Sequence, residues 1–278
     1  MTTLDQTISR EKPASSALGK IHLEAVAKTF HMRGQSIRAL DPVDLQVEPG
    51  EFVALVGPSG CGKSTILNLV AGLMPATSGT VAYDGKPVRD LNRLVGYMTQ
   101  KDTLLPWRRT ADNVRVALEL KCRDTSRAEA DEKVARMLEL VGLKGFENHY
   151  PSELSGGMRK RTLLARTLIY EPETLLMDEP FGALDAQLKL VMLDQLQTLT
   201  RQRDMTVLFV THDLGEAISL ADRVVVMSAR PGRIRTIRKI DLPRPRDVFK
   251  IRFTEAFARY HEELWDVLKD EVGRGTEM

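Results

Sequence analysis

The residues best suited to chemistry stand in a glycine-rich segment, GPSGCGKS at 57–64. It follows the apolar run 52–56, which has the length of a buried strand, and precedes apolar residues at helical spacing. Glycines let successive backbone N–H groups curl around phosphate oxygens, Lys63 can reach the β and γ phosphates of a nucleotide, and the Ser64 hydroxyl can bind Mg²⁺. We therefore predict a nucleotide site made of Gly57, Pro58, Ser59, Gly60, Cys61, Gly62, Lys63, Ser64 and Thr65.

Two adjacent carboxylates, Asp178 and Glu179, end the apolar segment 175–177. Asp178 is placed to hold Mg²⁺ through water, and Glu179 could polarise the attacking water as a general base. Strands often end in solvated acids, so this pair alone is a weak signal. The phosphate-binding segment upstream in the same chain favours the catalytic interpretation.

A second turn suited to anions, Ser155-Gly156-Gly157, stands before apolar residues at helical spacing. It offers free N–H groups, a hydroxyl and the positive end of a helix dipole. One nucleotide does not need two such sites within one chain. We therefore expect this turn to bind the γ-phosphate of an ATP held by a second copy of the chain.

Cys61 lies in the phosphate-binding segment, at a predicted helix N-terminus, where thiol pKa values tend to fall. This predicts a reactive thiol whose alkylation blocks ATP hydrolysis. Cys61 and Cys122 are the two cysteines of the chain, and neither lies in a segment typical of a metal site or a disulfide framework. Their scarcity fits the reducing cytosol.

The segments that must position these residues alternate between strand and helix patterns. Apolar runs at 52–56, 174–177, 207–210 and 224–227 are typical of buried strands, with helical stretches between the later ones. Two alternating bursts within 21–47 indicate an antiparallel hairpin region. The pattern predicts an α/β fold: a P-loop NTPase core of mainly parallel sheet with flanking helices, an antiparallel β subdomain and an inserted α-helical subdomain.

The inserted helical subdomain is predicted at approximately 101–160, where charges interleave with apolar residues at helical intervals. Residues 1–20 are polar and predict a disordered N-terminal tail. The ATPase domain is expected at 21–247, and 248–278 are expected to form an amphipathic C-terminal helix and tail. The apolar stripe of this helix, which we expect to pack on the chain's own domain, comprises Phe253, Phe257, Tyr260, Leu264, Val267 and Leu268.

The composition narrows the function classes only a little. The 278 residues are 42% hydrophobic and 28% charged, with a formal net charge of +2. These values are ordinary for a globular protein and give no global attraction to nucleic acid. No run approaches the roughly 18 to 20 apolar residues of a membrane span. If the protein works at a membrane, we expect another polypeptide to hold it there.

Taken together and in order, these motifs resemble the ATP-binding cassette (ABC) family, over about residues 21–247. LSGGM at 154–158 is similar to the family signature, and 175–179 to its Walker B segment. By this resemblance Gln100 is the Q-loop glutamine that touches Mg²⁺ and the lytic water, and His212 is the switch histidine that senses the γ-phosphate. Asp185 bridges the two subunits. Phe30 stands where the family places an aromatic that stacks on adenine, here Phe rather than the commoner Tyr.

The resemblance also implies cofactors, partners and a location. The cofactors are ATP and Mg²⁺. The partners are a second ATPase subunit, expected to form a homodimer, transmembrane permease subunits and, indirectly, an extracytoplasmic solute-binding protein, with no nucleic acid. The chain would be peripheral, on the cytoplasmic face of the bacterial inner membrane. The segments 104–107 and 230–246 resemble those of importers of nitrate, taurine and aliphatic sulfonates.

Several alternatives stay open at this point. A soluble ABC ATPase acting on nucleic acid or the ribosome usually carries two cassettes or a long coiled-coil insertion. A plain P-loop kinase or GTPase would not need the Ser-Gly-Gly turn or His212. The apolar cluster Leu104 to Trp107 is equally well explained as part of a groove for a permease coupling helix and as ordinary core. For the basic stretch 230–252, a solvated surface connection is favoured over a contact with anionic lipid.

Overall fold

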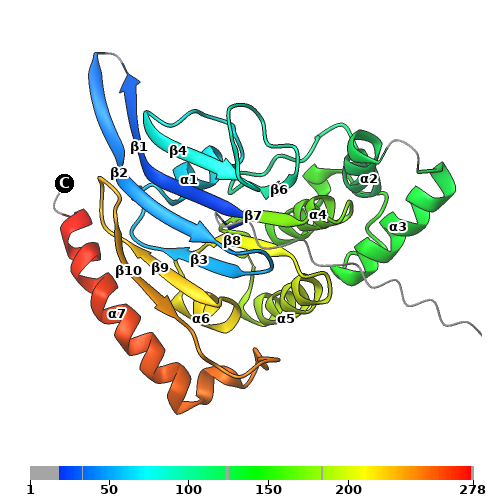
Figure 1. The fold of residues 1–278 in the computed structure, drawn as a ribbon. Coiled ribbons are helices and arrows are strands. Elements are labelled where there is room, and N and C mark those ends of the chain that lie inside the picture. Colours follow the sequence, from blue (N-terminus) through cyan, green and yellow to red (C-terminus); the bar gives the residue numbers. More distant parts are fainter. Residues whose placement is uncertain (1–18, 33, 123–124, 183, 277–278) are drawn as a thin grey trace, which may run out of the picture.

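The computed structural model describes residues 19–32, 34–122, 125–182 and 184–276, and the side chains of these ranges except 32 and 272–276. Most of the predicted N-terminal tail, 1–18, and the last two residues of the predicted C-terminal segment lie outside the described residues. The described chain contains two β-sheets, with helices packed beside them (Figure 1).

The larger sheet is six-stranded, in the order β10-β9-β3-β8-β7-β6. Neighbouring strands pair in parallel except β10, which is antiparallel to β9. Every residue of β3, β7 and β8 is buried, which explains their continuous apolar runs. The predicted fold class is confirmed. The strands are β3 (Phe52–Val56), β6 (Val95–Met98), β7 (Thr174–Asp178), β8 (Thr206–Val210), β9 (Arg223–Met227) and β10 (Ile234–Lys239).

The parallel strands place the predicted chemistry along one edge of this sheet. The phosphate-binding segment follows β3, Gln100 follows β6, Asp178 ends β7, and His212 follows β8. Because the carboxyl ends of parallel strands meet at one edge, residues far apart in the sequence come together there.

The smaller sheet is antiparallel, in the order β2-β1-β4-β5. Ile21 pairs with Val47 across β1 and β2, as the alternating pattern of this region predicts. Buried side chains of this sheet share a hydrophobic cluster with the apolar face of the helix after β3. The strands are β1 (Ile21–Met32), β2 (Gln35–Val47), β4 (Ser78–Tyr83) and β5 (Lys86–Pro87).

Apart from the C-terminal helix, the helices of the described residues form two groups (Figure 1). Those beside the sheets are α1 (Lys63–Val70), α5 (Ala186–Gln202) and α6 (Leu214–Leu220). Those of the helical lobe are α2 (Thr110–Lys121), α3 (Arg127–Leu140) and α4 (Gly156–Leu168), preceded by the 3₁₀ turn η1 (Pro151–Glu153). In the lobe α2 contacts both α3 and α4, while α4 also contacts β6. Thus α4 ties the lobe to the main sheet.

The C-terminal part differs from the expectation in two respects. Residues 234–239, predicted as a surface connection, form the edge strand β10. The helix α7 (Glu255–Thr276) runs alongside β10 and contacts α6, β9 and β10 (Figure 1). Its side chains Phe257, Tyr260, Leu264 and Leu268 are buried, as predicted. Phe253 is 83% exposed, because it ends the 3₁₀ turn η2 (Ile251–Phe253) before the helix begins.

Candidate functional site

The phosphate-binding segment forms the turn between β3 and α1. Gly62 caps α1 with a φ of 97°, in the left-handed region, and provides no side-chain cap. The first N–H groups of α1 therefore lack intrahelical partners and remain available to an anion. A Cβ on Gly62 would lie 2.4 Å from Leu40 Cδ2, so this backbone position has no room for a side chain.

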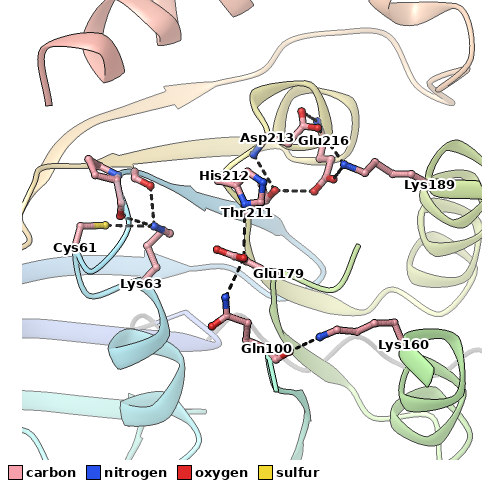
Figure 2. Close-up of polar contacts among 12 residues, drawn as sticks. Cys61, Lys63, Gln100, Lys160, Glu179, Lys189, Thr211, His212, Asp213 and Glu216 are labelled. Carbon is pink, nitrogen blue, oxygen red and sulfur yellow. Dashed lines mark hydrogen bonds and ion pairs between the residues drawn. The ribbon is translucent and has the colours of Figure 1, made fainter. Parts of the chain in front are cut away.

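Lys63 is held inside this turn. Its side chain is buried, and Nζ donates to Gly57 O at 2.7 Å and to Pro58 O at 2.8 Å (Figure 2). The ammonium group thus lies within the ring of backbone that the sequence predicts to surround phosphates. The arrangement places one positive charge and several N–H donors in a single concavity.

Asp178 and Ser64 form the second element of the site. Asp178 is buried, and burial raises the pKa of its carboxyl group, while a hydrogen bond with Ser64 and the charge of Lys63 oppose that rise. Asp178 Oδ1 has no hydrogen-bond partner among the described residues. A buried carboxylate oxygen without a donor beside a hydroxyl is a donor set that suits a hard divalent cation.

Glu179 forms the third element, with Gln100 and His212 (Figure 2). Gln100 Nε2 donates to Glu179 Oε2 at 3.1 Å, and His212 Nδ1 lies 3.6 Å from the same oxygen. Glu179 has a φ of 48°, unusual for a residue other than glycine, and such backbone strain concentrates at functional sites. The structure therefore brings together three residues that are widely separated in the sequence.

A cleft of about 440 Å³ joins these elements. Phe30 lies at one part of it on β1, opposite Ile37 of β2, and its ring is near Lys28 Nζ, 5.3 Å from the centroid. The described residues that line the cleft are Phe30, Ile37, Ala39, Ser59, Gly60, Gly62, Lys63, Ser64, Thr65, Gln100, Glu179 and Arg230.

Residues 40–182 match the family model described as ABC transporter. The chain belongs to the ABC transporter family. An uncharacterized ABC transporter ATP-binding protein of Methanocaldococcus jannaschii is 46% identical over 253 residues, 91% of this chain and 92% of that protein. The aliphatic sulfonates import ATP-binding protein SsuB of Bacillus licheniformis is 42% identical, over 79% of this chain and 84% of that protein. The SsuB of Bacillus cereus is 39% identical, over 84% of this chain and 92% of that protein.

Solved structures agree with this assignment. A dimeric post-hydrolysis state of the ATP-binding cassette MJ0796, bound to ADP and Pi, aligns with a TM-score of 0.74 and 32% identity over 80% of this chain and 100% of that chain. A second dimeric structure of MJ0796 gives 0.75 and 33% over the same shares. The chain is thus an ABC cassette, an ATPase and the ATP-binding subunit of a transporter.

In this cassette the Ser-Gly-Gly turn stands at the N-terminus of α4. Ser155 caps the helix, and its Oγ accepts from Met158 N at 3.2 Å. Ser155 and Gly156 are exposed, and neither is among the described residues that line the cleft of the same chain. Asp185 similarly caps α5, accepts from Leu188 N at 2.9 Å and is exposed. The structure does not bring these residues to the phosphate loop of their own chain.

Basic side chains of α4, the helix that begins within the LSGGM segment, contact the segment after β6. Lys160 Nζ donates to Gln100 O (Figure 2), and Arg159 forms an ion pair with Asp102 at 2.8 Å. Arg166 donates to the carbonyl and hydroxyl oxygens of Thr103. A displacement of Gln100 is therefore coupled to α4. Sequence reasoning missed these contacts, because nothing in the chain order indicates which basic residues of a helix face a distant loop.

A partly buried polar network includes the residues on either side of His212 in the sequence (Figure 2). Thr211 Oγ1 donates to Glu216 Oε2 at 2.6 Å, and Lys189 of α5 pairs with Glu216 at 2.8 Å and with Asp213 at 3.3 Å. Burial raises the pKa of Glu216. Sequence reasoning missed this network too. The available signal was Asp213 followed three residues later by Glu216, the spacing of a capping box.

The prediction of a reactive Cys61 is wrong. The thiol is fully buried, and burial raises its pKa, with Lys63 opposing the rise. Helix position alone suggested a lowered pKa, but the side chain points away from solvent, 3.5 Å from Lys63 Nζ. Burial therefore outweighs the helix N-terminus.

In the folded protein at neutral pH, we expect iodoacetamide to label half-buried Cys122 at least about tenfold faster than Cys61, because only an accessible thiolate reacts. ATP hydrolysis should survive the treatment. Peptide mass spectrometry after timed labelling measures both rates. Rapid labelling of Cys61 that ATP prevents would restore the original interpretation.

Proposed function

We propose that two copies of this chain hydrolyse ATP at two shared sites. Each nucleotide would lie between the phosphate loop of one copy and Ser155 to Gly157 of the other. The observation that carries this proposal is the composition of the cleft: it holds Lys63, Gln100 and Glu179 of one chain, whereas the second anion-binding turn is exposed elsewhere. The structure of the MJ0796 cassette, which is dimeric and bound to ADP and Pi, supports a nucleotide-bound dimer.

The contacts within the cleft support a division of roles. Glu179 acts as the general base on the attacking water, because its carboxylate lines the cleft, where it accepts from Gln100 and lies 3.6 Å from His212 Nδ1. Gln100 orients that carboxylate, and its main-chain carbonyl accepts a hydrogen bond from Lys160, which links it to α4. Phe30 stacks on adenine at the apolar part of the cleft. Asp185, exposed at the N-terminus of α5, contacts the second copy.

Mg²⁺ is the cofactor that best fits the donor set. Ser64, Asp178 and Gln100 would hold it together with phosphate oxygens, and it would neutralise charge that develops on the phosphates. The unpartnered buried oxygen of Asp178 supports this role. Among the described residues no cluster of three or more His, Cys, Asp or Glu side chains could hold a metal ion.

We expect Mg²⁺-dependent ADP binding to weaken as the pH falls. Burial raises the pKa of Asp178, so its carboxyl takes up a proton at a higher pH than an ordinary aspartate, and that proton competes with Mg²⁺. Because the folded state binds this proton more tightly than the unfolded state, the free energy of unfolding of the metal-free protein rises as the pH falls through this pKa.

In Asp178→Asn, ADP affinity in Mg²⁺ should drop by about tenfold and lose this pH dependence. Calorimetric ADP titrations with Mg²⁺ and with EDTA measure both effects. An unchanged response to Mg²⁺ in the variant would remove Asp178 from the metal site.

The transported solute is proposed to belong to the nitrate, taurine or aliphatic sulfonate class, with sulfonates preferred. The SsuB relatives from Bacillus, at 39 to 42% identity over 79 to 84% of this chain, carry this proposal. In this reading the chain powers uptake through a membrane permease that an extracytoplasmic binding protein supplies with solute. It would lie on the cytoplasmic face of the inner membrane, and no described helix is long and apolar enough to cross it.

A groove in the helical lobe is the proposed permease contact. It has a volume of about 680 Å³ and lies beside Trp107, whose side chain is 71% exposed. The two explanations of the apolar cluster 104–107 thus apply to different residues. Leu104 belongs to the core, while Trp107 is exposed and available to a partner. The groove is lined by two carboxylates, Asp112 and Glu119, which pair with Arg115 and Arg108. The arginines outnumber them, and this excess of positive charge favours a permease segment that carries acidic residues. The arginines of the lining are Arg108, Arg109, Arg115 and Arg127.

The test is to isolate the complex from membranes and measure ATP turnover with candidate solute-binding proteins, each with and without its solute. The proposal expects stimulation by a sulfonate-loaded binding protein, and loss of permease association in Trp107→Ala. Co-purification with nucleic acid in place of a permease would contradict the transporter assignment of the site. Stimulation by a binding protein for an unrelated solute would contradict the sulfonate assignment alone.

A further inference from the structure

Arg230 lines the nucleotide cleft, although it is not among the residues that the sequence assigned to the nucleotide site. It lies in the turn between β9 and β10, residues 228–233, and joins Phe30, the phosphate loop and Glu179 around the same cavity. Four other arginines of this basic stretch pair with carboxylates outside the cleft. Arg233 pairs with Asp41, Arg235 with Glu271, Arg238 with Glu263 and Arg244 with Asp222.

Among the described residues Arg230 has neither an ion pair nor a hydrogen bond from its guanidinium group, and its side chain is exposed. An arginine without a carboxylate partner beside a phosphate-binding cavity is a donor for an anion or for the face of an aromatic base. An arginine that only interacts with solvent does not need a rigid backbone. The contacts that hold the turn 228–233 in place therefore favour a binding role for Arg230.

The turn is packed directly on the nucleotide site. Gly232 N donates to Ala39 O at 2.9 Å, and Gly232 O accepts from Asp41 N at 3.0 Å. A Cβ on Gly232 would lie 1.9 Å from Cys61 O, so the turn touches the backbone of the phosphate loop and admits no side chain there. The backbone next to Arg230 thus cannot move away from the cleft without disturbing these contacts.

The C-terminal helix α7 braces the same turn. Glu271, which is 2% exposed, accepts from Ala229 N at 3.0 Å and pairs with Arg235 at 2.9 Å. Inside the turn, Ser228 Oγ accepts from Arg233 N at 3.0 Å. A buried carboxylate that holds the residue next to Arg230 fixes the start of the arginine side chain and lowers the entropic cost of its use in binding.

We propose that Arg230 binds the nucleotide at its base, ribose and α-phosphate end, and that Glu271 is a positioning residue for it. This inference rests on the proposed ATP site and adds Arg230 to the side chains that would contact the nucleotide. The γ-phosphate end is already served by Lys63 and by the Glu179, Gln100 and His212 group. Phe30 lies in the same cleft, so adenine would be enclosed between its ring and the Arg230 guanidinium.

The test measures ADP and ATP affinity of the full chain by calorimetry and steady-state kinetics. In Arg230→Ala the Kd for ADP and for ATP should rise by the same factor, about fivefold to tenfold, because the contact is shared by both nucleotides. KM should rise likewise while kcat changes less than about twofold. Arg230→Lys should recover part of the loss. The matched control is Arg238→Ala, which removes an arginine of the adjacent strand that lies outside the cleft.

Glu271→Gln should weaken ADP binding in the same direction, and this loss should vanish in the Arg230→Ala background, because positioning matters only when the arginine is present. A purely structural role for Glu271 would give additive losses and would contradict the positioning claim. Wild-type affinity for ADP in Arg230→Ala would overturn the inference, and so would a loss confined to ATP. If the wild-type chain itself bound no ADP, the proposed ATP site would fail instead.

Discussion

Glu179→Gln should reduce ATP turnover by at least about 10²-fold while leaving ATP affinity within about threefold of the wild type. The amide keeps the shape of the carboxylate and cannot accept the proton of the attacking water, and general-base catalysis contributes about 10²- to 10⁴-fold. Steady-state phosphate release and ATP binding to the purified chain measure the two quantities.

The matched control is Glu173→Gln, at the opposite end of β7, where the side chain is 79% exposed and pairs with Lys20. This change should leave turnover near the wild-type value. Near-normal hydrolysis in Glu179→Gln would remove Glu179 from the base role. A loss of ATP binding equal to the loss of turnover would instead assign Glu179 to binding.

Lys63→Ala should weaken ADP and ATP binding by roughly 10²-fold. The ammonium group is the positive charge held within the phosphate loop, and losing charge-assisted hydrogen bonds to two phosphates amounts to about 3 kcal/mol. Its removal also leaves the Gly57 and Pro58 carbonyls without this donor. Calorimetric titration with ADP and Mg²⁺ measures the loss.

Lys250→Ala is the control, because that side chain is 85% exposed and lies outside the cleft. It should bind ADP as the wild type does. Thermal unfolding of both variants distinguishes a binding defect from a folding defect. If Lys63→Ala bound ADP normally and remained folded, the phosphate loop would not be the nucleotide site.

The sequence predicted the parts of this structure that are local. The apolar run 52–56 is β3 with the predicted bounds, because a strand buried on both faces has no polar position to blur its pattern. The phosphate loop and the Asp178–Glu179 pair lie at strand ends, as their neighbours in the chain indicate. Gln100, placed by family resemblance, proves to contact Glu179 directly.

What the sequence could not predict depends on contacts between distant segments. The burial of Cys61 behind the turn at 228–233 reverses the expected shift of its pKa. Lys189 of α5 forms an ion pair with Glu216 of α6, and Glu271 of α7 accepts a hydrogen bond from Ala229 in the turn of Arg230. β10 escaped detection because an exposed edge strand rich in arginine resembles a connecting loop.

The sharing of each ATP between two copies is tested most directly by sedimentation of Glu179→Gln with and without Gly156→Asp. Among the described residues, a Cβ on Gly156 would approach only Arg159, at 3.9 Å, so the added carboxylate should not disturb the fold. With ATP and Mg²⁺, the single variant should sediment as a dimer. The double variant should still reach saturation with ATP, at a higher concentration because dimerisation no longer contributes to binding. It should remain a monomer, because its carboxylate would face the partner's γ-phosphate. A double variant that still dimerised with ATP, or a single variant that stayed monomeric while saturated with ATP, would contradict the shared site.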